Sequence, residues 1–204
     1  MTQRPTRALP GALVLTTSLF CSTMLAAQAA PLVVEVRAGA STPLASFATG
    51  SRAGEGTDTG ASFALDLVFT GETRRALYLG FSQHRFGCGG AGCAADAQYV
   101  ATGFAVGFRW DLLTRGSVIP WVRLGGITTS VETPDGITLS AEQAEGVSDL
   151  GYGTEMGLGV YIGTYSRVAL NPGVRFSAIN TGLPDGGLLR MRYLVADLAI
   201  TLSF

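Results

Sequence analysis

Hydrophobic and polar residues alternate along most of the chain from position 32 to its end. The last eleven residues show this most clearly, because every second position from Leu194 to Phe204 is apolar. The positions between them include Asp197, Thr201 and Ser203. A period of two puts these two sets on opposite faces of one extended segment. The pattern therefore predicts a β-strand at the end of the chain.

Seven further segments share this period, so the chain is predicted to form eight strands. The seven segments are residues 32–40, 61–70, 75–85, 99–111, 118–130, 151–162 and 167–178. The predicted connections are long at 41–60, 86–98, 131–150 and 179–191, and short at 71–74, 112–117 and 163–166. This alternation is typical of an up-and-down antiparallel meander with elaborate loops at one end. Because proline lacks the N–H of a ladder bond, Pro172 predicts a bulge inside its strand.

The strands have one bulky apolar face and one face of small and charged residues. The bulky set is too large for the interior of eight strands, so we expect it to face outward. An Arg facing lipid at mid-membrane would cost about 2–4 kcal/mol, and the alternation keeps four strand arginines off the apolar face. We therefore predict an all-β fold, an eight-stranded antiparallel up-and-down transmembrane β-barrel. Its lumen should hold a network of paired charges, namely Glu35, Arg37, Asp66, Arg109, Asp111, Arg123, Glu155, Arg175 and Asp197.

Residues 1–29 have the features of a cleaved secretory signal peptide. Arg4 and Arg7 precede a mostly apolar run, and residues 27–29 (Ala-Gln-Ala) fit a small-x-small cleavage site. A membrane anchor is the alternative, but polar residues at 16–18 interrupt the run. We expect cleavage after Ala29, which leaves residues 30–204 as the barrel domain.

Composition narrows the function classes. The net charge is −1, only 14% of the 204 residues are charged, and the mean hydropathy is +0.34. These values exclude a disordered, highly charged chain. All 14 basic residues are arginines, and they form no dense cluster, which argues against nucleic acid as a partner.

An exported chain would keep two cysteines, Cys88 and Cys93, after the signal peptide is removed. In an oxidising compartment this pair predicts a disulfide. A metal site that includes His84 is the alternative, but two Cys and one His make an incomplete ligand set. We predict no metal and no cofactor.

The chain resembles the small outer-membrane β-barrels of Gram-negative bacteria, of the OmpA transmembrane-domain and OmpX type. The resemblance rests on the signal segment, the eight alternating strands and a terminal Phe204 preceded by Leu198, Ile200 and Leu202. Residues 120–126 (PWVRLGG) are also similar to a strand common in that group. The resemblance implies location in the cell outer membrane, with both ends in the periplasm and the long loops outside. It also implies periplasmic chaperones and the barrel-assembly machinery as partners. The assembly signal would then be Leu198, Ile200, Leu202 and Phe204.

The leading functional hypothesis is a structural or surface-interaction barrel, monomeric and without a large pore, that acts through its long loops. The acids of loop 131–150 could bind a divalent cation or a basic partner, or could simply be solvated. Arg85, Arg190 and Arg192 are expected near the outer interface. There they could pair with phosphates of outer-membrane lipid and lipopolysaccharide, or merely extend into the interface.

Two other functions stay open. An enzyme acting on outer-leaflet lipid, like the PagL-type deacylases or PagP-type acyltransferases, needs a nucleophile and a base, for which Ser82 and His84 are the candidates. Their order does not match the deacylase pattern, in which His precedes Ser near the end of the chain, and we predict no enzymatic activity. A narrow conduit for small apolar solutes would use space beside inward glycines such as Gly103, Gly107 and Gly157.

Overall fold

The computed structural model describes residues 32–45, 47–49, 57–71, 74–88, 98–113, 115–132, 150–163, 167–182 and 188–204. Eight long strands account for most of them. They are β1 (Leu32–Pro43), β4 (Gly60–Thr70), β5 (Arg75–Cys88), β6 (Gln98–Asp111), β7 (Val118–Glu132), β8 (Gly151–Ile162), β9 (Val168–Gly182) and β10 (Leu188–Ser203). Two short strands, β2 (Ala48–Thr49) and β3 (Thr57–Asp58), follow β1 along the chain. Within these residues no helix is long and apolar enough to cross a membrane.

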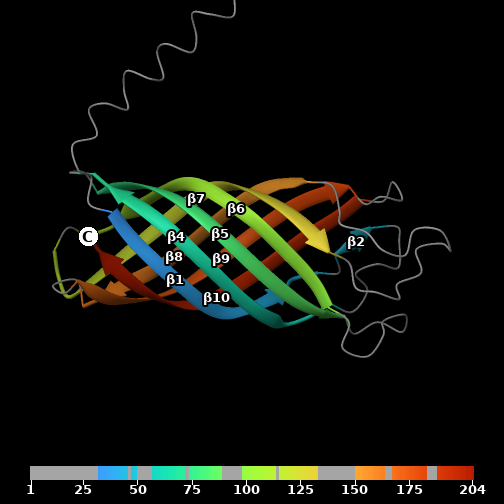
Figure 1. The fold of residues 1–204 in the computed structure, drawn as a ribbon, viewed down its shortest axis with the longest axis horizontal. Helices are drawn as coiled ribbons and strands as arrows, with labels where there is room; N and C mark the ends of the chain where they lie inside the picture. Colours follow the sequence, from blue (N-terminus) through green and yellow to red (C-terminus); the bar gives the residue numbers. More distant parts are fainter. Residues whose placement is uncertain are drawn as a thin grey trace, which may run out of the picture. The chain divides into compact units, whose positions relative to one another are not determined.

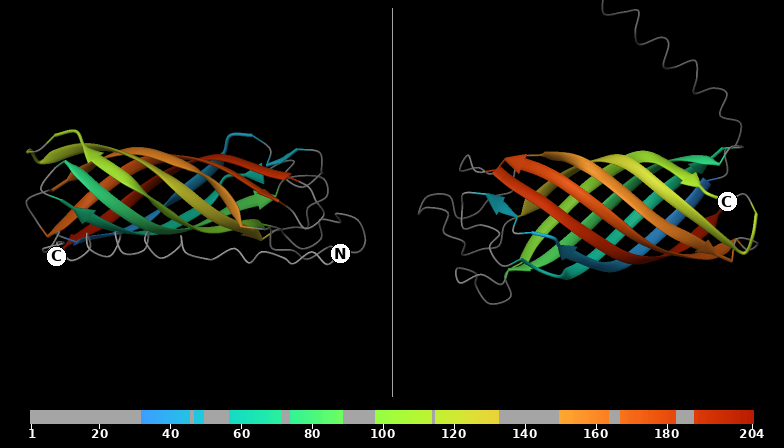
Figure 2. Two further views of the ribbon diagram at one scale, coloured as in Figure 1. Left: turned by 90° about the horizontal axis from the view of Figure 1, so that it is seen from above. Right: turned by 180° about the vertical axis from the view of Figure 1, so that it is seen from behind.

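The eight long strands form one closed antiparallel barrel. Each pairs with its neighbour in chain order, and β1 pairs with β10 from Val33↔Ser203 to Pro43↔Tyr193. The ribbon views show the strands wound obliquely around a single barrel (Figure 1, Figure 2). We call the end of the barrel at which β4 is followed by β5, β6 by β7 and β8 by β9 the turn end, and we call the opposite end the loop end. The predicted all-β, eight-stranded up-and-down barrel is confirmed.

Side chains alternate between the two sides of the barrel wall. Along β10, every second residue from Leu189 to Thr201 is buried and those between them are exposed. The exposed positions on the strands are mostly large and apolar, whereas the buried ones include Arg, Asp, Glu and Ser. This polarity is the reverse of that of a water-soluble barrel, as predicted, and it is typical of barrels whose wall faces lipid.

The predicted long connection at 179–191 is wrong. β9 continues to Gly182 and β10 starts at Leu188, so only residues 183–187 separate them. The reason is a change of polarity near the loop end. There the apolar residues Leu189 and Met191 are buried inside, whereas Arg190 is exposed outside. Here apolar residues point inward and a charged residue points outward, the opposite of the rest of the strand. A pattern that expects apolar residues on the outside therefore did not identify these residues as strand.

The predicted bulge at Pro172 is also wrong. β9 keeps one register against β10 from Leu188↔Gly182 to Leu202↔Val168, and Pro172 faces Leu198 within it. On the β8 side the pairs Gly159↔Gly173 and Ile162↔Leu170 share one register, with the ladder interrupted between them. Proline therefore removes local pairing without inserting an extra residue.

Candidate functional site

A closed ring of alternating charges crosses the lumen. We call it the charge ring, and it consists of three arginines and three carboxylates from six strands. Its contacts join Arg37 to Asp66 (2.9 Å), Asp66 to Arg123 (2.8 Å), Arg123 to Glu155 (2.5 Å), Glu155 to Arg175 (3.4 Å), Arg175 to Asp197 (2.7 Å) and Asp197 to Arg37 (2.8 Å). The strands β1, β4, β7, β8, β9 and β10 are thus linked through their side chains as well as through their backbones.

Glu35 joins the ring to β6. Its carboxylate contacts Arg37, accepts a 2.8 Å hydrogen bond from Arg109 Nη1 and accepts another from the Tyr161 hydroxyl. Arg109 Nε lies 3.6 Å from Asp111, whose side chain is 30% exposed at the end of β6. Of the nine predicted network residues, eight thus lie in one buried cluster and Asp111 lies at its rim.

Aromatic rings line this network, although no sequence motif marks these residues as part of it. The guanidinium carbon of Arg123 lies 4.6 Å from the centre of the Tyr78 ring, Arg109 lies 4.8 Å from Tyr161, and Arg37 lies 5.4 Å from Trp121. Desolvated cation–π contacts of this kind contribute about 2 kcal/mol. The available signal was strand parity, because all three aromatic residues share the inward parity of the charged residues.

The ring and Glu35–Arg109 together balance four arginines against four carboxylates. Every one of these groups is at most 7% exposed. An unpaired charge in such a place would cost several kcal/mol, whereas here each charge contacts at least one opposite charge. The arrangement is therefore a neutral, packed plug across the lumen.

Inward glycines make room for this plug. A Cβ built on Gly157 would lie 3.1 Å from Arg175 Cγ and 3.2 Å from Arg123 Cγ. A Cβ on Gly159 would lie 2.5 Å from Cζ2 of Trp121, whose Nε1 donates a 2.8 Å hydrogen bond to Asn171. Space beside these two glycines is occupied by side chains and does not extend as an open channel.

The lumen changes character towards the loop end, where it is filled by an apolar cluster. This loop-end cluster includes Phe47, Phe86, Tyr99, Val131, Ile179, Leu189, Met191 and Tyr193. Phe47 comes from the connection after β1 and is fully buried, with its ring edge-on to Phe86 at 4.9 Å. We call the described residues 44, 45 and 47–49 the strap. Leu44 N donates to Arg192 O at 2.8 Å, Arg190 N donates to Phe47 O at 2.7 Å, and β2 pairs with β10.

Ser82 and His84, the candidate catalytic pair, both face the lumen. His84 is 1% exposed, and its Nδ1 lies 3.2 Å from Ser41 Oγ on β1. Its ring packs 5.0 Å from that of Tyr193. Within the described residues no hydrogen bond joins Ser82 to His84, so the structure brings His84 to a different serine, away from solvent and from the outer wall.

The other predicted sites lie elsewhere. Cys93 is outside the described residues, so the Cys88–Cys93 disulfide stays a prediction, as does the signal peptide of residues 1–29. No group of three His, Cys, Asp or Glu residues suited to a metal occurs among the residues that the structure describes. The terminal residues Leu198, Ile200, Leu202 and Phe204 all point outward, with exposures from 38% to 77%.

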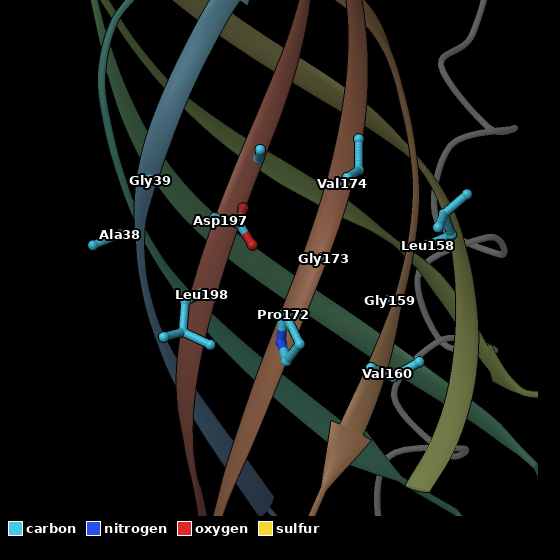
Figure 3. Close-up of a pocket in the computed structure, with 11 residues that line it drawn as sticks. Ala38, Gly39, Leu158, Gly159, Val160, Pro172, Gly173, Val174, Asp197 and Leu198 are labelled. Carbon is cyan, nitrogen blue, oxygen red and sulfur yellow. The ribbon is translucent and has the colours of Figure 1, made fainter.

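Two shallow apolar grooves run along the outer wall, the first across β8, β9, β10 and β1 and the second from β10 across β9, β8 and β7 to β6. The first, of about 610 Å³, is lined by small residues such as Ala38, Gly159 and Gly173 (Figure 3). The second, of about 480 Å³, extends from Leu194 and Phe176 to Trp110. Because both are lined by Leu158 and Val174, they adjoin and form one branched depression. We call it the wall groove.

Several solved structures share the fold of this barrel. The crystal structure of Neisserial surface protein A aligns with a TM-score of 0.62 at 14% identity, covering 86% of this chain and 97% of that one. OprG from Pseudomonas aeruginosa aligns with a TM-score of 0.57 at 12% identity, covering 84% and 95%. The chain has the fold of the small eight-stranded outer-membrane β-barrels.

The N-terminal β-barrel domain of Pseudomonas aeruginosa OprF shares this fold as well, with a TM-score of 0.51 at 12% identity over 84% of this chain and 97% of that one. No family model and no curated protein matches the sequence. The likeness is therefore one of architecture, and the lumen and wall of this outer-membrane-type barrel have to be interpreted from its own residues.

Proposed function

We propose that the protein is an integral barrel of the outer membrane that anchors its loop end at the cell surface and conducts no large solute. The observation that carries the proposal is the charge ring, which fills the lumen with neutralised side chains. Behind it, the loop-end cluster closes the other half with packed aromatic and aliphatic groups. Recognition would then belong to the connections at the loop end, as is common for loops held on a rigid scaffold.

The outer wall supports the membrane position. Its exposed residues include Phe104, Val106, Phe108, Leu124 and Leu158, each more than half exposed. Single exposed apolar residues are ordinary on soluble proteins, but a continuous apolar band around a closed barrel is suited to lipid. The proposal includes export by a cleaved signal peptide, help from periplasmic chaperones and the barrel-assembly machinery, and a monomeric barrel.

Conductance in planar lipid bilayers tests this function directly. The wild-type protein, refolded in lipid and checked by heat-modifiable gel mobility, should give no stable conductance steps of porin size. Surface labelling of intact cells with a membrane-impermeant reagent should modify a cysteine placed in residues 133–149 but not one placed in the connection 112–117. Steady porin-like conductance, or labelling of the turn end alone, would overturn the proposal.

No specific observation on the described residues favours the two other functions, a lipid-modifying enzyme and a conduit for apolar solutes. Ser82 and His84 are buried apart from lipid, and the space beside Gly157 and Gly159 is filled. An assay of lipid A composition in cells that express the His84→Ala variant decides the first of these. We expect the same composition as with the wild type.

A further inference from the structure

We propose that the outer wall of β8, β9 and β10 binds a phosphorylated lipid of the outer leaflet, with Arg190 and Arg192 holding its phosphates and the wall groove holding an acyl chain. The inference goes beyond the anchoring function and rests on the proposed outer-membrane position of the barrel. The sequence left two interpretations of these arginines open, namely side chains that extend into the lipid interface and side chains that bind lipid phosphates, and the inference favours the second.

The two arginines stand together on one face of one strand. Both side chains point outward and are exposed, and two residues along β10 separate their Cα atoms by about 7 Å. Within the described part of the chain, all nine ion pairs involve other arginines. Two exposed guanidinium groups side by side on one strand are suited to bidentate contacts with phosphate oxygens.

The neighbouring strands add polar groups at the same level. Arg190 faces Asn180 on β9, and Asn180 faces Tyr152 on β8, so the three lie in one row across the wall. Tyr152 is 65% exposed and Asn180 is exposed. A tyrosine at this boundary is typical of the interfacial aromatic residues of membrane proteins. The row therefore offers hydrogen-bonding groups to a polar headgroup.

The wall groove begins at the next outward position after Arg192, on the membrane side of the two arginines. The next outward residue after Arg192 on β10 is Leu194, and its partner on β9 is Phe176. Both line the 480 Å³ branch of the groove, which continues past Met156 and Leu158 to Trp110 near the turn end. From Leu194 to Leu202 every outward position of β10 is apolar. A molecule with an anionic head and a hydrocarbon tail matches this order of groups.

Arg85 supplies the matched comparison. It is exposed near the loop end of β5, as Arg192 is on β10, and two strands, β1 and β4, lie between them. No residue of β5 lines either branch of the wall groove. If the arginines acted only as interfacial charges, Arg85 would bind phosphate lipids as well as the β10 pair does.

The test is a titration of the folded protein in detergent with bisphosphorylated lipid A, read by native mass spectrometry. We expect the Arg190→Gln/Arg192→Gln variant to bind this lipid at least about tenfold more weakly than the wild type, and Arg85→Gln to bind it normally. Enzymatically dephosphorylated lipid A should bind the wild type about as weakly as intact lipid binds the double variant. Equal losses in both variants, or no loss in either, overturn the proposal.

A separate experiment tests whether an acyl chain occupies the wall groove. Val174→Trp, which fills the shared part of the wall groove from outside, should weaken lipid A binding, whereas Leu79→Trp on the outward face of β5 should not. Inorganic phosphate at equal concentration should not displace the lipid from the wild type. Displacement by phosphate, or identical binding by both Trp variants, means that no acyl chain occupies the groove and overturns the assignment of a lipid. Heat-modifiable mobility confirms folding of each variant, and none of these results depends on conductance.

Discussion

Arg37 Nη1 donates a 2.8 Å hydrogen bond to Asp197 Oδ1, and this contact joins the first strand of the barrel to the last. The two residues lie 160 positions apart and meet beside the seam where β1 pairs with β10. The same guanidinium also contacts Glu35 and Asp66. Closure of the barrel is therefore coupled to the burial of one arginine among three carboxylates.

Replacing Arg37 should destabilise the barrel strongly. Arg37→Met leaves the carboxylates of Glu35, Asp66 and Asp197 without their shared cation, and breaking a buried pair in this way costs about 3–5 kcal/mol. Urea unfolding in lipid vesicles, followed by gel mobility, measures the loss. Arg85→Met is the control, because Arg85 is exposed outside the wall and should change stability by less than about 0.5 kcal/mol. A loss below 1 kcal/mol for Arg37→Met would contradict the central place of Arg37.

The charge ring should behave as a unit in double-mutant cycles. Arg123 lies 2.5 Å from Glu155. Each single replacement, Arg123→Met or Glu155→Gln, therefore leaves the remaining charged group without this ion-pair partner. We expect the double variant to be more stable than the sum of the single losses predicts, by about 0.5–3 kcal/mol. Arg75→Gln combined with Glu155→Gln serves as the control. Arg75 is exposed at the turn end, so these two losses should add.

The sequence predicted most of the barrel because apolar outward residues alternate with polar inward residues along most of each strand. All eight predicted segments are strands, and the acids and bases on their inward faces meet in the lumen. What it could not predict is which acid meets which base, since that depends on the register and tilt of strands far apart in sequence. Arg123, for example, contacts Asp66 on β4, 57 positions earlier in the chain, as well as Glu155 on the adjacent strand.

The prediction failed where the barrel interior changes from charged to apolar. At the loop end of β10 the buried residues Leu189 and Met191 are apolar and Arg190 faces outward, which resembles a soluble barrel. Phe47 was missed for a different reason. It belongs to a connection without periodicity, and its burial depends on tertiary contacts with Phe86 and Tyr99 that no local pattern encodes.

Enlarging Gly159 should displace Trp121. A Cβ at this position would lie 2.5 Å from Cζ2 of the indole, so Gly159→Val forces the ring to move and weakens its hydrogen bond to Asn171. Overpacking of this kind costs about 1–3 kcal/mol. Near-ultraviolet circular dichroism and urea unfolding should both report the change. Gly126→Val is the matched control, because the nearest atom to its added Cβ is Gly153 O at 4.0 Å. An unchanged aromatic signal in Gly159→Val would show that Trp121 does not occupy this place.

Removing the Phe47 ring should release the strap and leave the barrel closed. Phe47 is fully buried against Phe86, whereas Leu44 in the same strap is 52% exposed. Truncation of a buried Phe costs about 3–5 kcal/mol, and here the cost falls on a segment whose strand pairing, among the described residues, is with the end of β10. In Phe47→Ala we therefore expect faster hydrogen exchange at the Leu44 and Arg190 amides, which donate to Arg192 O and Phe47 O, with heat-modifiable mobility as in the wild type. In Leu44→Ala the Arg190 amide should exchange at the wild-type rate. Loss of the folded mobility form in Phe47→Ala would instead show that the strap holds the whole barrel together.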